Sequence, residues 1–300
     1  METKSGFVAM IGRPNVGKST LINKIVGQKV VITSNKPQTT RKKIRAIYTE
    51  NRGQIIFTDT PGFNKPKNKL GEFMRNETGT GIADVDVICY VIEPSDFVGE
   101  SESQIIELLK SASAKIILVI NKADTVKKDV LFPVIEKFTE LVNPEAVVPV
   151  SARTGNNVDE LINVIFDLLD EGPLFYDEDE VTDQPIKVIA AEIIREKALH
   201  ALSMEIPHGI AVVIEKFKER ETDKGIITDI EAVIYCERDS HKGIIIGKNG
   251  QMLKKIGSNA RYELERELDC KVNLQLWVKV NRDWRNSSLD LKNFGFTPGE

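Results

Sequence analysis

The sequence predicts an α/β protein in which a mostly parallel sheet with helices on both faces is followed by a smaller α+β domain. Over residues 7–169, short apolar runs typical of buried strands alternate with stretches typical of amphipathic helices. Residues 171–185 interrupt this alternation with two prolines and six acidic residues. Beyond them, the order of elements changes. We therefore expect domains over 1–172 and 186–300, the second with a C-terminal tail, joined by a linker over 173–185.

Changes of hydrophobic period define the individual elements. Continuous apolar runs such as FVAMI and KIILVI are typical of strands buried on both faces, and apolar residues three and four apart are typical of helices. In the first domain we expect strands over 7–11, 43–50, 53–60, 84–93, 115–122 and 146–152, and helices from residue 18 and over 101–112, 130–142 and 157–172. In the second domain we expect helices over 189–203 and 251–268 and strands over 210–220, 225–238 and 271–280.

The composition excludes several classes of protein. The chain has 300 residues, of which 41% are hydrophobic, so it can bury two globular cores. The three cysteines and three histidines lie far apart and predict neither a disulfide framework nor a metal cluster. No apolar run approaches the ~18 residues of a membrane span, and the first strand is expected too early for a leader peptide. We expect a soluble, cytoplasmic protein.

The stretch GRPNVGKST matches the phosphate-binding pattern G-x-x-x-x-G-K-[ST], and it lies between an expected strand and an expected helix. Backbone N–H groups of such a loop surround the β-phosphate at the helix N-terminus, where the helix dipole also favours anions. Lys18 would reach the β- and γ-phosphates, and the Ser19 hydroxyl would ligate Mg²⁺. The residues expected to bind the nucleotide here are Gly12, Asn15, Val16, Gly17, Lys18, Ser19 and Thr20.

The stretch DTPG follows the strand IIFT directly. At the C-terminal end of a parallel strand, its carboxylate would lie beside the phosphate loop. Asp59 would then hold Mg²⁺ through a water molecule, and the Gly62 N–H would face the γ-phosphate. Taken alone, the four residues favour an ordinary turn.

A third stretch, NKAD, ends the strand KIILVI and would read the base. Asp124 suits guanine, whose N1–H and 2-amino group are adjacent donors, whereas adenine would leave the carboxylate unpaired. Asn121 would tie this segment to the phosphate loop, and the stem of Lys122 would cover the base. After the next strand come Ser151 and Ala152, and the Ala152 N–H could donate to the guanine 6-oxo group. The motifs together predict a GTP and GDP site.

These motifs, in this order, resemble the translation-factor-related GTPases over residues 6–170. The resemblance implies that the loop PQTTR, residues 37–41, supplies a threonine to Mg²⁺ and the γ-phosphate, and we expect Thr40 rather than Thr39. The implied catalytic residues are Lys18, Thr40 and Gly62, and the implied metal ligands are Ser19, Thr40 and Asp59.

Phe63 occupies the place where Ras-like GTPases carry the glutamine that positions the attacking water. Phenylalanine cannot do so, and the resemblance is therefore to a subgroup that hydrolyses GTP slowly alone. A partner's side chain or a monovalent cation would have to assist. Asn15 matches an asparagine that relatives are thought to use for K⁺, although it could equally be only a turn residue.

The net charge is −4, yet residues 241–285 contain ten Lys and Arg against five Asp and Glu. This window indicates either a surface for a polyanion or a solvated helix face. Within it, Gly247 and Gly250 form a GxxG turn, which in a KH domain clamps the backbone of single-stranded nucleic acid. A simple helix–helix connection is the alternative. The expected RNA-binding residues are Gly247, Lys248, Asn249, Gly250, Lys254 and Lys255.

The stretch GIII before the GxxG turn is expected to end a further helix. With it, the order helix, strand, strand, helix, helix, strand matches a type II KH domain. One GTPase domain followed by one KH domain resembles the Era family of bacterial ribosome-assembly GTPases. This resemblance implies a monomer that binds near the 3′ end of 16S ribosomal RNA and assists small-subunit assembly. It also implies peripheral membrane association, for which the sequence gives no support. A signalling or RNA-modification GTPase, whose second domain binds protein or substrate, is the alternative.

Overall fold

The structure, a computed structural model, describes residues 3–34, 36, 38–63, 66–202, 209–223 and 225–297. Pro37 of the expected loop, the last residue of the helix expected over 189–203, and the end of the expected C-terminal tail lie outside these ranges. The chain divides into one unit of residues 1–67 and 71–183 and a second of residues 68–70 and 184–300. Residues 173–183, expected in the linker, therefore lie within the first unit.

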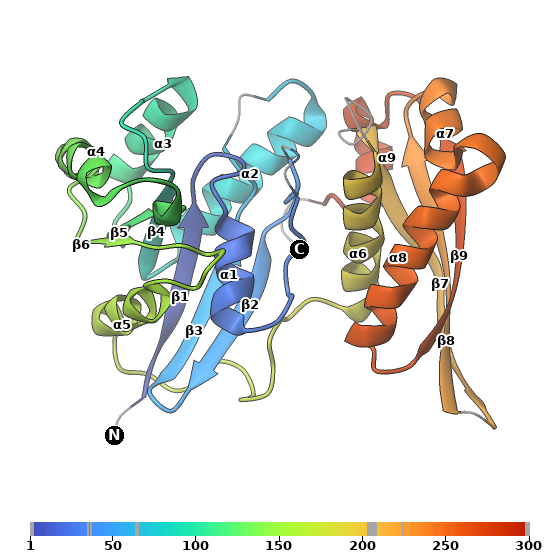
Figure 1. Ribbon diagram of the computed structural model, residues 1–300, viewed down its shortest axis with the longest axis horizontal. Helices are drawn as coiled ribbons and strands as arrows, with labels where there is room; N and C mark the ends of the chain where they lie inside the picture. The colour runs from blue at the N-terminus through green and yellow to red at the C-terminus, as the bar shows by residue number, and fades with distance from the viewer. Residues whose placement is uncertain are drawn as a thin grey trace. The chain divides into compact units, whose positions relative to one another are not determined.

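Within the described residues, the first unit contains a six-stranded sheet in the order β2-β3-β1-β4-β5-β6 (Figure 1). Only β2 is antiparallel to its neighbour. The strands are β1 (Lys4–Ile11), β2 (Ile44–Glu50), β3 (Gly53–Asp59), β4 (Val87–Ile92), β5 (Lys115–Ile120) and β6 (Ala146–Pro149). The predicted fold class of this domain is thereby confirmed.

Helices cover both faces of this sheet because successive strand residues point to opposite faces and both sets are apolar. On one face, Val8 and Met10 pack with residues of α1 and α5; on the other, Ala9 and Ile11 pack with α3 and α4. The helices are α1 (Lys18–Val26), α2 (Lys69–Ala83), α3 (Glu100–Lys110), α4 (Lys128–Val142) and α5 (Val158–Leu168), with a 3-10 turn at η1 (Ala123–Thr125). The sequence did not predict α2, whose three glycines weaken its helical pattern.

Residues 171–183, here called the strap, run along the first unit's sheet. Glu171 pairs with Lys4 at the start of β1, and the Phe175 ring lies 5.0 Å from that of Phe7. Further on, the Ile47 N–H of edge strand β2 donates to the Val181 carbonyl at 2.9 Å. The strap therefore covers an edge that would otherwise expose unpaired backbone groups.

The second unit contains, within its described residues, a three-stranded sheet in the order β7-β8-β9. Strands β7 and β8 are antiparallel, and β8 and β9 are parallel. Its elements are α6 (Ile186–Ala201), β7 (Ala211–Thr222), β8 (Gly225–Cys236), α7 (Asp239–Ile246), η3 (Lys248–Gly250), α8 (Gln251–Glu267), β9 (Lys271–Val280), η4 (Trp284–Asn286) and α9 (Ser288–Asn293). The predicted α-β-β-α-α-β order is confirmed. No helix in the described ranges is long and apolar enough to cross a membrane.

Candidate functional site

The phosphate loop joins β1 to α1, and Gly17 is the last residue before the helix. Gly17 has a φ of 99°, and a Cβ there would lie 2.3 Å from the Asn121 side-chain nitrogen. Any other residue would be strained and would push Asn121 away. Gly17 therefore lets the NKAD segment, residues 121–124, lie close to the phosphate loop.

Lys18, at the start of α1, is 6% exposed and lies inside this loop. Its Nζ donates to the carbonyls of Gly12 at 3.0 Å and Arg13 at 3.1 Å. Burial lowers the pKa of Lys18 to about 8, although the nearby carboxylates of Asp59 and Glu102 act in the opposite direction. The Lys18 ammonium thus lies in a site where it has lost its hydration. A bound anion would compensate for that loss.

Asp59, at the end of β3, lies at the centre of a cluster of oxygen atoms. Its Oδ2 accepts hydrogen bonds from Ser19 Oγ at 2.7 Å and from Thr40 Oγ1 at 2.9 Å, and the two hydroxyls are 3.2 Å apart. Among the described residues, the buried Oδ1 has no hydrogen-bond partner. Burial raises the pKa of Asp59, against the effects of Lys18 and the two hydroxyls. Hard oxygen donors around an unsatisfied buried carboxylate fit Mg²⁺.

The stretch DTPG is held against the phosphate loop. A Cβ at Gly62 would lie 2.9 Å from Pro14 Cα, so only glycine allows this approach. The next side chain, Phe63, is 8% exposed and packs in the core with Ile11 and Ile82. Phe63 is therefore a core residue.

A buried carboxylate that the sequence did not reveal supports the phosphate loop from outside. Glu102, in the first turn of α3, is 1% exposed. It accepts from the Tyr90 hydroxyl at 2.5 Å and pairs with the Arg13 guanidinium. In the sequence, Glu102 resembles any acid that favours a helix N-terminus, so no signal distinguished it.

Asn121 links three segments of the first unit. Its Nδ2 donates to the Val16 carbonyl at 2.8 Å, and its Oδ1 accepts from the Ala152 N–H at 3.0 Å. The Ala152 N–H, expected to donate to guanine, is thus engaged by Asn121. Lys122 donates to the Asn15 carbonyl at 2.8 Å and also pairs with Glu93.

The Asp124 carboxylate lies beside Arg153, whose nitrogen is 2.5 Å from Asp124 Oδ2. Hydrogen bonding from Ser151, and then from Arg153, holds the pKa of Asp124 below its usual value. The carboxylate is therefore kept ionised as an acceptor. Arg153 is 77% exposed along its side chain, whereas that of Asp124 is 16% exposed.

In the second unit, the GxxG turn lies between α7 and α8. Gly247, Asn249 and Gly250 all have positive φ values, of 73°, 52° and 75°. A Cβ built on Gly250 would meet no described atom within 4 Å. The main chain is therefore open to a ligand at Gly250, whereas a Cβ at Gly247 would lie 2.7 Å from Met252 Cβ.

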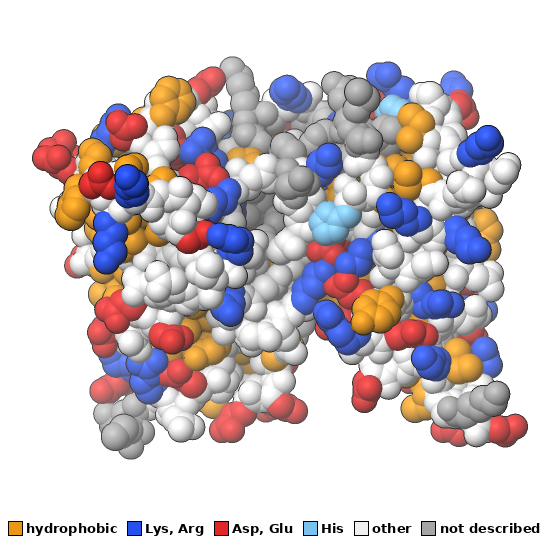
Figure 2. Space-filling view, viewed as in Figure 1, with side chains coloured by type: hydrophobic (Ala, Val, Ile, Leu, Met, Phe, Trp, Pro, Cys, Tyr) orange, Lys and Arg blue, Asp and Glu red, His pale blue; other side chains and the backbone are white. Residues whose placement is uncertain are grey.

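A groove of about 360 Å³ continues from this turn between α8 and β9. Lys254 lines it, but Lys255 instead lines a separate cavity between α8 and α6. The sequence also missed Arg261 and the apolar Leu274 and Leu276 in the groove. Arg261 lies seven residues after Lys254 and hence on the same side of α8, and Leu274 and Leu276 lie two residues apart on one face of β9. These spacings could have indicated all three residues. Figure 2 shows Lys and Arg side chains over the face of this unit that bears α6, α7 and α8.

Comparisons with known proteins agree with this division of the chain. A family model described as "50S ribosome-binding GTPase" matches residues 7–122, and one described as "KH domain" matches residues 205–285. GTPase Era of Ruminiclostridium cellulolyticum is 52% identical over 296 residues, which are 99% of this chain and 98% of that protein. GTPase Era of Carboxydothermus hydrogenoformans is 51% identical over 300 residues, the full length of both chains.

Two solved structures are also similar. A variant of Aquifex aeolicus Era bound to GDP·AlF4⁻ has a TM-score of 0.93 and 39% identity, with 98% of this chain and 100% of that chain covered. A crystal structure of Era in complex with MgGDPNP and nucleotides 1506–1542 of 16S ribosomal RNA has a TM-score of 0.94 and 39% identity, with 98% and 99% covered.

Proposed function

The chain belongs to the Era family of GTPases, and on that basis we propose that it is a GTP-hydrolysing switch that binds single-stranded ribosomal RNA through its KH domain. Its target is a segment near the 3′ end of 16S rRNA, as in the Era complex with that RNA, and its role is to assist small-subunit assembly. The observation that carries the proposal is the presence, in one chain, of the Asp59 oxygen cluster and an open GxxG turn beside a basic groove.

In the nucleotide site, the phosphates of GTP or GDP lie against the loop from Gly12 to Thr20. Lys18 leaves the carbonyls of Gly12 and Arg13 and donates to the β- and γ-phosphates. Because Ser19 and Thr40 give their protons to Asp59, their lone pairs are free to ligate Mg²⁺. When bound, Mg²⁺ would neutralise negative charge on the phosphate oxygens. The Gly62 N–H completes the γ-phosphate contacts.

Base recognition falls to the segment that Asn121 ties to the phosphate loop. The guanine N1–H and 2-amino group replace Arg153 at the Asp124 carboxylate, which is already ionised. Ser151 supports that carboxylate, Lys122 covers the base, and the 6-oxo group lies towards Ala152. A base without two adjacent donors leaves Asp124 unpaired, which disfavours ATP.

Hydrolysis is slow in the isolated protein, because Phe63 is packed in the core and offers no group to position water. We further propose that K⁺ held by Asn15 is one source of assistance, with a side chain from the ribosomal partner as the other. Hydrolysis rates in potassium and sodium salts at equal ionic strength test the cation, and equal rates would exclude it.

The other finer assignments rest on the family resemblance. We propose that the protein acts in the cytoplasm as a monomer on the small ribosomal subunit. Peripheral membrane association stays a prediction from the resemblance alone.

RNA binding by the variant Lys248→Asp/Asn249→Asp tests the proposed function. The change places two negative charges where RNA phosphates approach the turn, so affinity for single-stranded 16S rRNA 3′-terminal RNA is expected to fall at least a hundredfold. GTP binding serves as the control and is expected to stay unchanged, since both glycines are kept. Retention of full RNA affinity would leave the turn as a helix connection and refute RNA binding by this domain.

A further inference from the structure

A second cavity, of about 450 Å³, lies on the flank of α8 opposite the GxxG groove. Lys197 and His200 of α6 line one side of it, and Lys255, Asn259, Tyr262 and Glu263 of α8 line the other. It is larger than the groove, and nothing in the proposed clamping of RNA by the GxxG turn uses it.

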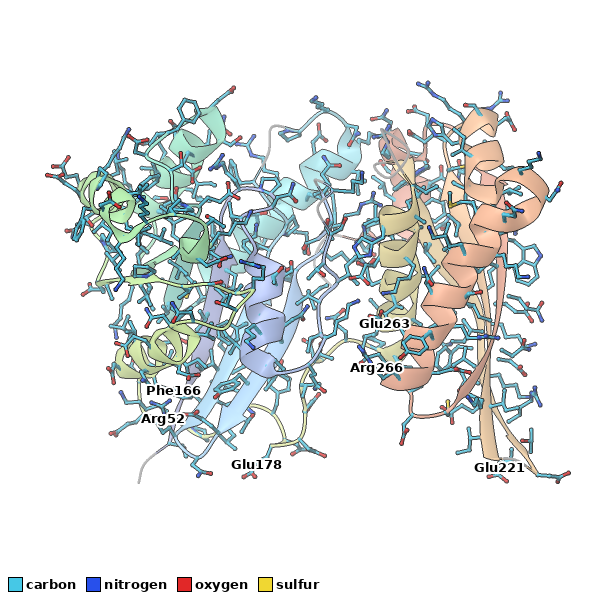
Figure 3. All side chains as sticks on the ribbon, in the orientation of Figure 1. Arg52, Phe166, Glu178, Glu221, Glu263 and Arg266 are labelled. Atoms are coloured by element: carbon cyan, nitrogen blue, oxygen red, sulfur yellow. The ribbon has the colours of Figure 1, made fainter. Side chains whose placement is uncertain are left out.

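The floor of this cavity is a buried network of charges. Lys197 donates to Glu196 at 2.9 Å and pairs with Glu263, and their carboxylates are 1% and 11% exposed along their side chains. Figure 3 shows Glu263 on the side of α8 that faces α6. The Lys197–Glu263 pair links the two helices. Its carboxylates also repel a phosphate from the floor but can accept hydrogen bonds from the amino group of a base.

The rim of the cavity has the opposite character. Tyr262 is 73% exposed, an unusual exposure for a large aromatic ring. Lys255, seven residues earlier on α8 and hence on the same flank, forms no ion pair within the part of the chain that the structure describes. An exposed aromatic ring beside an unpaired ammonium is suited to stacking one base while neutralising the adjacent phosphate.

From this arrangement we propose that the cavity is a second nucleotide subsite, in which one base of a single-stranded RNA stacks on Tyr262 and its phosphate contacts Lys255. The base edge points to the carboxylate floor, which favours bases that carry an amino group over uracil. His200 and Asn259 supply further hydrogen-bonding groups at the wall. This subsite rests on the proposed function, to which it adds a second contact with the RNA.

The two sites belong to one RNA path because α8 forms a wall of both. Lys254 faces the groove and its neighbour Lys255 faces the second cavity, so a strand leaving the groove meets Lys255 after crossing the helix. A KH groove holds about four nucleotides. The subsite therefore engages only RNA that extends beyond the groove.

RNA length separates the two sites experimentally. Full-length protein is titrated by fluorescence anisotropy with an RNA of about five nucleotides, enough to fill the groove, and with one of about twelve that extends it in both directions. Tyr262→Ala is expected to weaken binding of the longer RNA about tenfold and to leave the shorter one unchanged. Tyr262→Phe, which keeps the stacking ring, is expected to bind both as the wild type does.

Two control variants complete the design. Trp277→Ala removes another exposed aromatic ring from the face of β9 opposite Leu276 and the groove, and should change neither affinity. Lys254→Ala should weaken both RNAs. If Tyr262→Ala weakens both RNAs equally, or neither, the second subsite is wrong while RNA binding in the groove stands. If the wild-type protein binds neither RNA, the proposed function fails, and the subsite fails with it.

Discussion

At the scale of single residues, the nucleotide site depends on charges that have been taken out of water. Lys18 and Asp59 are both buried, and burial shifts their pKa values in opposite directions, each towards the neutral form. Phosphate and Mg²⁺ are the ligands that favour the charged form of each group. The site is therefore built for an anion and a cation bound together.

Lys18 makes nucleotide binding dependent on pH. Its pKa in the empty site is about 8, below its ordinary value of 10.5, so the folded protein holds fewer protons than the unfolded chain between these values. The empty protein consequently gains stability as the pH rises through this window, whereas phosphate binding requires the ammonium. We expect GDP affinity to be constant below about pH 8 and to fall above it.

Calorimetry in buffers of different ionisation enthalpy measures this linkage directly. Near pH 9, GDP binding should take up a proton, and the uptake should disappear in Lys18→Ala. Binding without proton uptake near pH 9 would contradict the role assigned to Lys18.

Asp124→Asn tests the reading of the base. An amide cannot accept from both guanine donors, but it can donate to the 2-oxo group of xanthine. We expect GTP affinity to fall by a factor on the order of 10⁴, with xanthosine triphosphate becoming the better ligand. Asp129→Asn, on the surface of α4, is the matched control. If Asp124→Asn still prefers GTP, the base is read elsewhere.

At the scale of elements, the strap is the least expected feature of the first unit. The side chain of Gln54, on β3, is fully buried beneath it. Its Oε1 accepts from the Phe175 and Tyr176 N–H groups, both at 3.0 Å, and its Nε2 donates to the Tyr176 carbonyl at 3.1 Å. One side chain therefore satisfies three backbone groups of the strap. The strap leads directly from the β2 edge to α6.

Gln54→Leu is expected to lower the free energy of unfolding by about 2 kcal/mol, because these backbone groups lose their partner. Hydrogen exchange should accelerate at the Phe175, Tyr176 and Ile47 amides, since all three depend on the strap. Urea unfolding and exchange measure the two effects. Gln104→Leu is the control, because the Gln104 amide makes one long hydrogen bond of 3.5 Å, to Glu100 on α3. It should change neither the stability nor the exchange of these amides. Unchanged exchange in Gln54→Leu would show that the amide does not hold the strap.

The sequence predicted elements well where hydrophobic period and length are strong, as in β1, β4 and β9. It failed at α2, whose glycines leave little pattern. It also did not reveal that the acidic segment predicted as a linker packs on the first unit, because polar and proline residues are typical of a linker. Packing of the strap depends on Gln54, more than a hundred residues away in the chain. A contact of that kind has no local sequence signal.

The same limit applies to the sites. The motifs placed Ser19 and Asp59 at one site, and the family resemblance added Thr40; the three side chains lie within hydrogen-bonding distance of one another. The sequence did not reveal the Glu102 support of the phosphate loop, and it placed Lys254 and Lys255 in a single site. Neighbouring helix residues point about 100° apart, so two lysines in a row face different partners once α8 is packed.

At the scale of the whole molecule, the central claim is that GTP binding in one unit and RNA binding in the other are coupled. Coupling requires that each ligand change the affinity of the other by the same factor, typically about 5- to 150-fold. Thr40, which we propose contacts the γ-phosphate, lies four residues before β2. The Ile47 N–H of β2 donates to Val181 of the strap, and the strap continues along the chain into the second unit. A path for such coupling therefore runs through one backbone hydrogen bond and the chain that follows it.

The most direct measurement is the affinity of the full-length protein for single-stranded 16S rRNA 3′-terminal RNA when loaded with a non-hydrolysable GTP analogue and when loaded with GDP. We expect RNA to bind at least about fivefold more tightly to the GTP-analogue form, and the same RNA to raise the affinity for the analogue relative to GDP by an equal factor. Equal RNA affinities in the two nucleotide states would contradict the claim that this GTPase is an RNA-binding switch.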